Sequence, residues 1–403
     1  MTDVASRPTD ATTDDEVRVR EATERLLAEH PPASTPPQDF LGAQFDAGLA
    51  WVHFSEGSGG LGLRPKLQGV VQELLRGTRA PHSGLRNPIG YGMGAPTVYT
   101  HGSDAQRERY LRPLFTGEEI WCQMFSEPGA GSDVASLSTR AERDGDEWIV
   151  NGQKVWTTLA HVSRWGMLVA RTDPDQPKHK GLTYFVVDMH GPGVEVRPLY
   201  QITGEAEFNE VYFTDARVPD AERLGEVGEG WRVSITTLMN ERVSIGGNVP
   251  ARGTGLIELA VKAWREVGAP AGPARDELVR LWIRSEVLRL TNWRASQTRA
   301  MGTPGPEGSI GKSAMAELYK AITEFAITVS GPQGMLLPGG YPMARPETAL
   351  DLSSAAKAFL RCRANSIEGG TTEIMKNILG ERVLGLPGDV RTDKELPWTH
   401  VPR

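Results

Sequence analysis

The sequence predicts an α+β fold in which helical segments stand on both sides of a β-rich segment. From about residue 15 to 118 apolar residues recur at helical spacing, as in "EVRVREATERLLAEH". From 119 to 225 the period changes to two, and from 226 to 403 the helical spacing returns, as in "DELVRLWIRSEVLRLTNW". We therefore expect three domains in the order α–β–α, with the first 14 or so residues frayed.

Two glycine-rich strings interrupt the first helical segment. "GSGGLG" at 57–62 and "GYGMGA" at 90–95 both fit the dinucleotide-binding fingerprint as strings. That fingerprint works only where a strand leads into a helix whose first turn faces a diphosphate. Pro65 and Pro96 follow the two strings, and no alternation of strands and helices surrounds them. We predict loop glycines at both places.

The middle segment contains the clearest strand signals. "EWIVNGQKVW" holds two short alternating runs around Asn151-Gly152, a pair that favours a tight type I′ turn, so we predict a hairpin there. The strand pattern continues in "WGMLVART", "LTYFVVDM" and "EVRPL", and "NEVYFTDARVP" closes the segment.

Composition narrows the class of protein. The 403 residues include 44 basic and 51 acidic side chains, and no long Lys/Arg run suggests nucleic acid as a partner. No apolar run approaches the ~20 residues that span a bilayer, and the N-terminus resembles neither a secretory signal nor a transit peptide, so we expect a cytoplasmic protein without membrane segments. Cys122 and Cys362 have no CxxC partner, which predicts two buried thiols and no metal site.

Three motifs in a fixed order carry the functional information. "SEPGAGSDVAS" at 126–136 is too rich in Gly and Pro to continue a helix or a central strand. It is followed by the Asn-Gly pair with "KVWTT" and, more than two hundred residues later, by "IEGGTTEIMKNILGERVLGLP". Together these resemble the acyl-CoA dehydrogenase family, over nearly the whole chain.

The resemblance implies an N-terminal helical domain, a middle β-barrel and a C-terminal four-helix bundle, with FAD held between the last two. Ser126 matches the family position near flavin N5, and Ser132 the position near the pyrimidine edge or the pantetheine arm of the substrate. Trp156 matches the aromatic residue that packs on the isoalloxazine, and Thr158 the hydroxyl at its polar edge. Arg242 matches an arginine near the substrate.

In "GGTTEI", the resemblance assigns Thr371 and Glu373 to the FAD diphosphate and adenosine. The same residues independently predict a loop followed by a helix N-cap, whose first turn favours anions.

The glycine loop "SGPQGM" matches a family segment that touches the cofactor across a subunit boundary, through Gln333 and Gly334, although its Pro332 departs from the pattern. The usual Arg-x-x-Phe near Arg265 is also replaced, by "REVGAPAGPAR".

Two carboxylates are candidates for the base that removes the α-proton of a thioester. The commoner family position holds Gly369 here, with Glu368 one residue before it. The other family position holds Glu241, which lies three residues after Leu238 and four before Ile245 and so shares their helix face. We rank Glu241 first, because a one-residue shift would turn Glu368 away from the space that the commoner position faces. An ion-paired structural role remains the alternative for Glu241.

The resemblance thus implies an acyl-CoA dehydrogenase of lipid metabolism that forms a trans-2-enoyl thioester and passes electrons to an electron-transferring flavoprotein. Two alternatives stay open: a flavin oxidase or monooxygenase on the same fold, and a non-catalytic subunit of a mixed oligomer. We expect a homotetramer or a dimer of heterodimers, because the 369–374 loop in this family completes the cofactor site near a neighbouring subunit.

Overall fold

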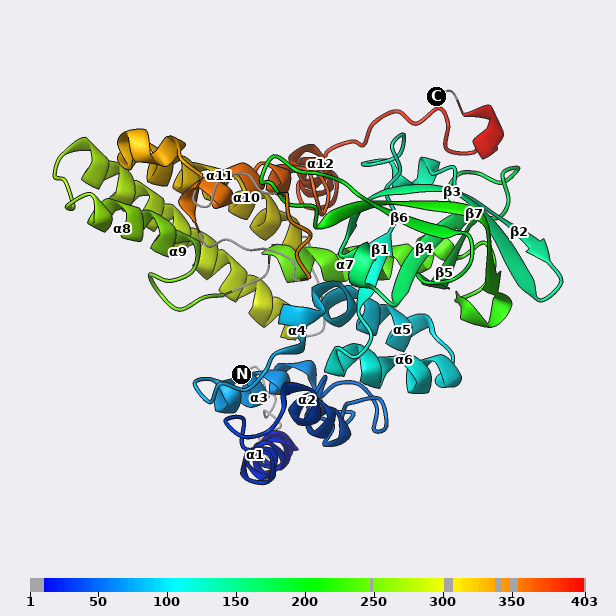
Figure 1. Ribbon diagram of the computed structural model, residues 1–403, viewed down its shortest axis with the longest axis horizontal. Helices are drawn as coiled ribbons and strands as arrows, with labels where there is room; N and C mark the ends of the chain where they lie inside the picture. Colours follow the sequence, from blue (N-terminus) through cyan, green and yellow to red (C-terminus); the bar gives the residue numbers. More distant parts are fainter. Residues whose placement is uncertain (1–10, 247–248, 301–306, 338–342, 348–353, 402–403) are drawn as a thin grey trace, which may run out of the picture. The chain divides into compact units, whose positions relative to one another are not determined.

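The structure is a computed structural model that describes residues 11–246, 249–300, 307–337, 343–347 and 354–401. It contains helices on both sides of a β segment along the chain, which confirms the predicted α+β class (Figure 1). The chain forms two compact units, Met1–Trp121 and Cys122–Arg403, and each is described by itself below.

The first unit is helical. Its helices are α1 (Ala11–Glu29), α2 (Pro37–Asp46), α3 (Gln68–Leu75), α4 (Ser83–Arg86), α5 (Ala95–His101) and α6 (Asp104–Thr116). Val19, Phe40 and Val71 are fully buried and bring α1, α2 and α3 into one core. The prediction of a frayed start is wrong for residues 11–14, because α1 already begins at Ala11, and residues 1–10 lie outside the described residues.

The two glycine strings of this unit differ from each other. Gly57, Gly59 and Gly62 have φ angles of 84°, 81° and 67° and belong to a loop, as predicted. The prediction of a loop at 90–95 is wrong, because Gly90–Gly94 form a π-helical turn that leads directly into α5. Pro96 lies in the first turn of α5, where its missing N–H costs nothing.

The β segment of the second unit forms one mixed sheet, in the order β6-β7-β3-β2-β4-β5-β8 with β1 beside β4 (Figure 1). Its strands are β1 (Trp121–Met124), β2 (Arg140–Asp144), β3 (Glu147–Thr158), β4 (Trp165–Arg171), β5 (Leu182–Asp188), β6 (Val194–Pro198), β7 (Phe208–Pro219) and β8 (Arg223–Leu224). The predicted strands at β4, β5, β6 and β7 are confirmed. Buried side chains such as Leu168, Phe185 and Val211 fill one core against the sheet.

The predicted hairpin at Asn151-Gly152 is wrong, because β3 runs through both residues without turning. The pair lies at a register shift against β7, where Asn151 exchanges two 3.0 Å hydrogen bonds with Asp215. A Cβ on Gly152 would lie 2.7 Å from the Cα of Thr139, so glycine is required by close packing here. The reversal instead occurs between β2 and β3, at Gly145 with φ 64°.

The C-terminal part of the second unit is helical. Its helices are α7 (Gly230–Gly246), α8 (Leu256–Glu266), α9 (Pro273–Ala300), α10 (Glu307–Val329), α11 (Ala355–Arg361) and α12 (Thr372–Arg382). Helix α10 packs against α7, α8, α9, α11 and α12, and the first three of these with α10 form the expected bundle. Figure 1 shows α8, α9 and α10 side by side.

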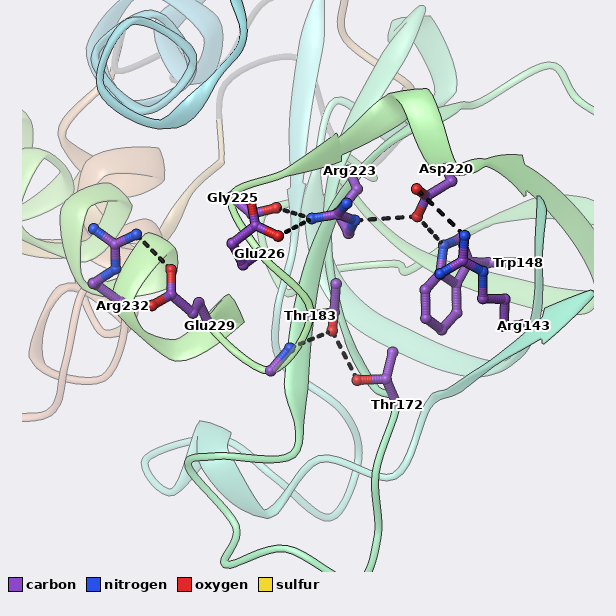
Figure 2. Close-up of polar contacts among 11 residues, drawn as sticks. Arg143, Trp148, Thr172, Thr183, Asp220, Arg223, Gly225, Glu226, Glu229 and Arg232 are labelled. Atoms are coloured by element: carbon purple, nitrogen blue, oxygen red, sulfur yellow. Dashed lines mark hydrogen bonds and ion pairs between the residues drawn. The ribbon is translucent and has the colours of Figure 1, made fainter. Parts of the chain in front are cut away.

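A polar network fixes the connection from the sheet into α7 (Figure 2). Arg223 donates to Asp220 at 3.1 Å and to the carbonyl of Gly225. The backbone N–H of Gly228 donates to the Thr183 hydroxyl on β5 at 3.1 Å. The connection is therefore tied to β5 at Gly228, two residues before α7 begins.

The segment after α12 returns to the sheet. Trp398 donates its indole N–H to the carbonyl of Ser136 at 3.3 Å, and the guanidinium of Arg171 lies 4.6 Å from the centre of its ring. Lys178 is ion-paired with both Asp393, at 3.0 Å, and Asp133, at 2.8 Å. This segment thus supports the loop that follows "SEPGAGS".

Both thiols are buried and free, as the sequence predicts. Burial raises the pKa of Cys122 to about 12, so this thiol is inert at neutral pH. Within the described part of the chain, no helix combines the length and the apolar character needed to cross a bilayer.

Candidate active site

The loop after β1 is held from inside by a buried ion pair. Glu127 turns inward and accepts hydrogen bonds from the backbone N–H groups of Ser138 and Thr139, at 2.7 and 2.9 Å. Lys154, on β3, is fully buried and donates to Glu127 at 2.9 Å and to the Phe125 carbonyl at 3.0 Å. Burial lowers the pKa of Lys154. Burial also acts to raise the pKa of Glu127, but Lys154 together with the N–H groups of Thr139 and Ser138 outweighs it and lowers that pKa. These bonds tie the start of the loop, at Glu127, to Ser138 and Thr139 and to β3.

Next to this ion pair, Trp156 presents its ring to solvent. The register of β3 against β7 shifts between Lys154 and Thr157, so β3 carries one extra residue there. Trp156 takes the rare φ of 61° for a bulky side chain, and 58% of it is exposed. Its ring meets Phe208 edge-on at 5.8 Å between centroids. This positive φ at the register shift leaves the ring of Trp156 as an open aromatic face.

The serines and threonines predicted around this ring occupy different environments. The carbonyl of Ser126 accepts from the backbone N–H of Val155 at 2.9 Å, which places Ser126 directly beside Trp156. Ser132 is exposed and Thr158 is half-buried. The buried hydroxyl of Thr157, which sequence reasoning missed, has no hydrogen-bond partner among the described residues.

The start of α12 has the predicted N-cap. The Thr371 side chain accepts from the backbone N–H of Ile374 at 3.2 Å, and Glu373 is exposed in the first turn. The neighbouring Thr372 hydroxyl is buried and, within the described part of the chain, makes no hydrogen bond. Gly370 has φ 91°, and a Cβ there would lie 2.5 Å from the end of the Met375 side chain. The turn before α12 therefore depends on glycine.

The glycine loop "SGPQGM" forms a short 3₁₀ turn, Gly331–Met335, at the end of α10. Gln333 is exposed, and Gly334 packs so closely that a Cβ would lie 2.4 Å from the Ile327 carbonyl oxygen. Among the described residues, neither Gln333 nor Gly334 hydrogen-bonds to the groups around Trp156 or Glu241, so their role across a subunit boundary stays a prediction.

Glu241 lies on α7 with its carboxylate facing β1. It accepts a 3.5 Å hydrogen bond from the side chain of Gln123 and is partly buried. Burial is the largest influence on this carboxyl and raises its pKa to about 7, and the charge of Glu368 acts in the same direction. The hydrogen bond from Gln123 and the positive charges of Arg242 and Lys312 oppose that rise. The group can therefore exchange a proton near neutral pH.

The helix face that carries Glu241 is anchored to the sheet. One turn before it, the Thr237 hydroxyl is buried and pairs with Tyr184 of β5 at 3.0 Å. Leu238 is partly buried, as expected, and the side chain of Ile245 lies outside the described residues. The anchor holds Glu241 on the Gln123 side of α7.

Glu368 is bound differently. Both of its oxygens accept from the guanidinium of Arg361, at 3.1 and 3.0 Å, and Arg361 also donates to buried Glu207 at 3.0 Å. Burial opposes the charge of Arg361, but the two carboxylates outweigh it and raise the pKa of the guanidinium. Arg361 lies 5.3 Å from the ring centre of Phe208, which in turn meets Trp156. Glu368 is thus fixed in a two-oxygen ion pair, whereas Glu241 has no such partner among the described residues.

Lys312 completes the cluster from α10. It is fully buried and donates to the carbonyl of Gly370. Burial lowers its pKa, against the charges of Glu368, Glu241 and Glu373. Arg242, also expected here, is half-buried on α7, and burial lowers its pKa.

Comparison with known proteins identifies the family to which the chain belongs. Models of the N-terminal, middle and C-terminal domains of acyl-CoA dehydrogenases match residues 13–118, 122–216 and 228–384. The acyl-CoA dehydrogenase IpdE1 of Mycobacterium tuberculosis is 38% identical over 86% of this chain and 86% of its own length. The chain belongs to the acyl-CoA dehydrogenase family.

Two further relatives span the same length. The human mitochondrial short-chain specific acyl-CoA dehydrogenase is 28% identical over 84% of this chain and 80% of its own. The solved structure of the steroid acyl-CoA dehydrogenase Tcur3481-Tcur3483 superposes with a TM-score of 0.73, over 95% of this chain and 99% of that one, at 24% identity. The predicted family and its three-domain fold are therefore confirmed.

Acyl-CoA dehydrogenases are FAD flavoproteins, and three features of this chain fit such a cofactor. A flat ring system can stack on the exposed face of Trp156. The hydroxyls of Thr157 and Thr372, which have no partner among the described residues, can each bond a polar ligand. The capped N-terminus of α12 offers backbone N–H groups and a positive dipole end to a diphosphate.

Sequence reasoning missed Gln123, Lys312 and Arg361 in this acyl-CoA dehydrogenase. A signal existed for Lys312, which lies four residues before fully buried Ala316 and so belongs to the apolar face of its helix. Arg361 likewise lies three residues after fully buried Ala358. A cation on an apolar helix face must have an anionic partner, and that rule could have singled out both.

Proposed function

We propose that this chain oxidises an acyl-CoA thioester to the trans-2-enoyl-CoA, with FAD as its cofactor and Glu241 as the base. The observation that carries the proposal is the contrast between two carboxylates. Glu241 has a pKa raised to about 7 and one neutral hydrogen-bond donor, whereas Glu368 is held by both oxygens in an ion pair. A base must offer a free oxygen to the proton it removes.

In this proposal the ionised Glu241 takes the pro-R α-hydrogen of the thioester as a proton. The side-chain amide of Gln123 holds one carboxylate oxygen, Oε2, and leaves the other for the substrate. The surrounding burial keeps the carboxylate poorly solvated, which raises its affinity for a proton. FAD, when bound, supplies the acceptor for the β-hydrogen, which leaves as hydride.

For FAD binding we propose Ser126, Ser132, Trp156 and Thr158 on the β segment, with Thr371, Glu373, Gln333 and Gly334 on the helical segment. Ser132 and Arg242 are proposed to contact the substrate. In support, the Ser126 carbonyl accepts from the N–H of Val155, next to Trp156 in the chain, and Thr371 caps the helix whose N-terminus suits a phosphate.

The FAD proposal predicts a yellow protein whose cofactor binding depends on Trp156. Trp156→Ala should weaken FAD retention or shift the flavin spectrum, because a stacked aromatic face contributes about 1 kcal/mol or more. Absorption spectra and FAD titration of the apoprotein measure both effects. Tyr200→Ala, which removes another exposed aromatic ring of the second unit, is the control and should change neither. An unchanged spectrum and affinity in Trp156→Ala would remove this residue from the cofactor site.

We propose an electron-transferring flavoprotein as the electron acceptor, on the strength of the family. The alternative is a flavin oxidase or monooxygenase, in which oxygen reoxidises the flavin. Peroxide release during turnover separates them: the dehydrogenase releases little and needs an added acceptor, whereas stoichiometric peroxide would favour the alternative.

The substrate class is the least specified part. Relatives and structural neighbours carry names as different as short-chain specific and steroid acyl-CoA dehydrogenase. A panel of straight, branched and ring-bearing acyl-CoAs, assayed with an artificial acceptor, tests the proposed activity directly. Activity on none of them would favour a non-catalytic subunit. That reading also predicts that the purified chain binds FAD only with a co-expressed homologue.

We further propose a homotetramer or a dimer of heterodimers. Along α9 a stripe of apolar side chains at helical spacing is exposed in the single chain: Val279, Ile283, Val287, Leu290 and Trp293. An apolar helix face of this length is typical of a subunit interface. Sedimentation at several concentrations measures the state, and a monomer that holds FAD tightly at high dilution would contradict the proposal.

A further inference from the structure

Lys312 has no part in the proton transfer proposed above, yet its position is unusual. It is fully buried on α10, where an ammonium group is costly unless it is bonded and compensated. Among the described residues, its ammonium group donates to the carbonyl of Gly370, at the turn before α12. Helix α10 packs against both α7 and α12, so Lys312 lies where the helix of Glu241 meets that turn.

The turn that Lys312 bonds consists of two glycines. Gly369 and Gly370 have φ angles of 63° and 91°, and neither has a side chain that could anchor it. Gly369 stands where the family resemblance would place a carboxylate. The hydrogen bond from Lys312 therefore fixes the direction of the Gly370 carbonyl and, with it, the start of α12.

The charge of Lys312 also acts on the proposed base. Three charged groups act on Glu241: Arg242 on its own helix, Lys312 from α10 and Glu368 from the turn before α12. The neutral amide of Gln123, on β1, also donates to it. Glu368 repels a second negative charge, although Arg361 binds it. Lys312 is the cation supplied by a different helix, and it favours the ionised carboxylate against burial.

We propose that Lys312 is a positioning residue that holds the Gly369–Gly370 turn against α10 and keeps Glu241 ready to accept a proton at neutral pH. The inference rests on the proposed function, because it assumes that Glu241 is the base. In this proposal one buried side chain both fixes a glycine turn and balances the charge of the site. No sequence motif assigns either role to a residue.

The test compares Lys312→Met with the wild type. Lys312→Met keeps an unbranched side chain and removes the charge. At pH 7, flavin reduction by acyl-CoA should slow about fivefold, because losing a nearby opposite charge raises the pKa of a carboxyl by roughly one unit, which lowers the ionised fraction of Glu241 from about one half to about one tenth. Above about pH 9 the ionised base is restored, and the rates should agree within about twofold. Equal rates of wild type and variant at pH 7 would overturn the charge-balancing role.

A control and a second variant keep the result specific. Lys320→Met removes a lysine of the same helix that is paired with Glu317 at 2.7 Å, and it should leave the pH dependence unchanged. Lys312→Arg retains the charge and should keep the wild-type pH midpoint even if its rate falls. Where Lys312→Met does not fold, a displaced midpoint in a folded Lys312→Arg variant would overturn the proposal.

Two readouts without turnover separate this inference from the proposed function. Infrared difference titration, with Glu241→Gln to assign the carboxyl band, reports the protonation of Glu241 itself. Its midpoint should move to higher pH in Lys312→Met, whether or not Glu241 proves to be the base. Hydrogen exchange of the amides at 369–374 should quicken in the same variant. An unmoved midpoint together with unchanged exchange would refute the inference, whereas wild-type turnover by Glu241→Gln would refute the proposed function alone.

Discussion

Glu241→Gln should still bind FAD and acyl-CoA but lose flavin reduction by about 10²-fold or more, because the amide keeps the shape of the side chain and removes the proton acceptor. Gln123 can rotate its amide to bond the new side chain, so the contact between β1 and α7 survives. Anaerobic stopped-flow bleaching of the flavin by a substrate measures the rate. Wild-type bleaching by this variant would show that the base lies elsewhere.

Glu368→Gln is the matched comparison, because it makes the same chemical change at the other candidate carboxylate, in the turn before α12. It breaks a two-oxygen ion pair with Arg361 rather than removing a base, so its rate should fall much less than that of Glu241→Gln. Arg361 keeps its bond to Glu207, which limits the rearrangement. A larger loss in Glu368→Gln than in Glu241→Gln would reverse our ranking of the two carboxylates.

The second large effect concerns stability. Lys154→Met should lower the free energy of unfolding of the second unit by about 3–5 kcal/mol, because it leaves Glu127 buried without a counter-charge. The loop that carries Ser126 should loosen with it, since Glu127 ties that loop to the N–H groups of Ser138 and Thr139. Urea unfolding measures the loss, and FAD retention reports the loop.

Two variants make this result interpretable. Lys154→Met combined with Glu127→Gln removes both charges and should recover part of the lost stability. Arg217→Met breaks an exposed ion pair with Glu147 on the same sheet, 2.9 Å long, and should change stability little. Equal losses in Lys154→Met and Arg217→Met would mean that the burial of the pair has no energetic consequence.

The fold could be predicted because its signals are periodic. The change from helical to strand spacing and back appears in the order of elements from α1 to α12. The errors occurred where a short motif has two possible uses. Asn151-Gly152 suits a tight turn, but it serves a register shift inside β3, because the close approach of Thr139 also requires glycine. "GYGMGA" suits a loop, but a π-helical turn with Pro96 in the following first turn accommodates it as well.

The site could be predicted only where a motif fixes a local conformation. The cap at Thr371 and the closeness of Ser126 to Trp156 follow from residues within a few positions of each other or from paired strands. The outward turn of Trp156 could not be read from sequence, because a register shift against β7 produces it. The contrast between Glu241 and Glu368 depends on hydrogen bonds from Gln123 and Arg361 and on the charge of Lys312. These three residues lie on other elements and act on the carboxylates only after folding.

The central claim, that Glu241 is the base, is tested most directly by the pH dependence of flavin reduction in single-turnover experiments. Burial raises the pKa of Glu241 to about 7, and only the ionised form accepts a proton. The rate should therefore rise with pH, reach half of its maximum near pH 7 and level off above it. Glu368→Gln should keep a rise of the same form, with a midpoint at slightly lower pH because one repelling charge is lost. If instead Glu241→Gln retains the wild-type rate and profile, and Glu368→Gln abolishes them, the account is wrong.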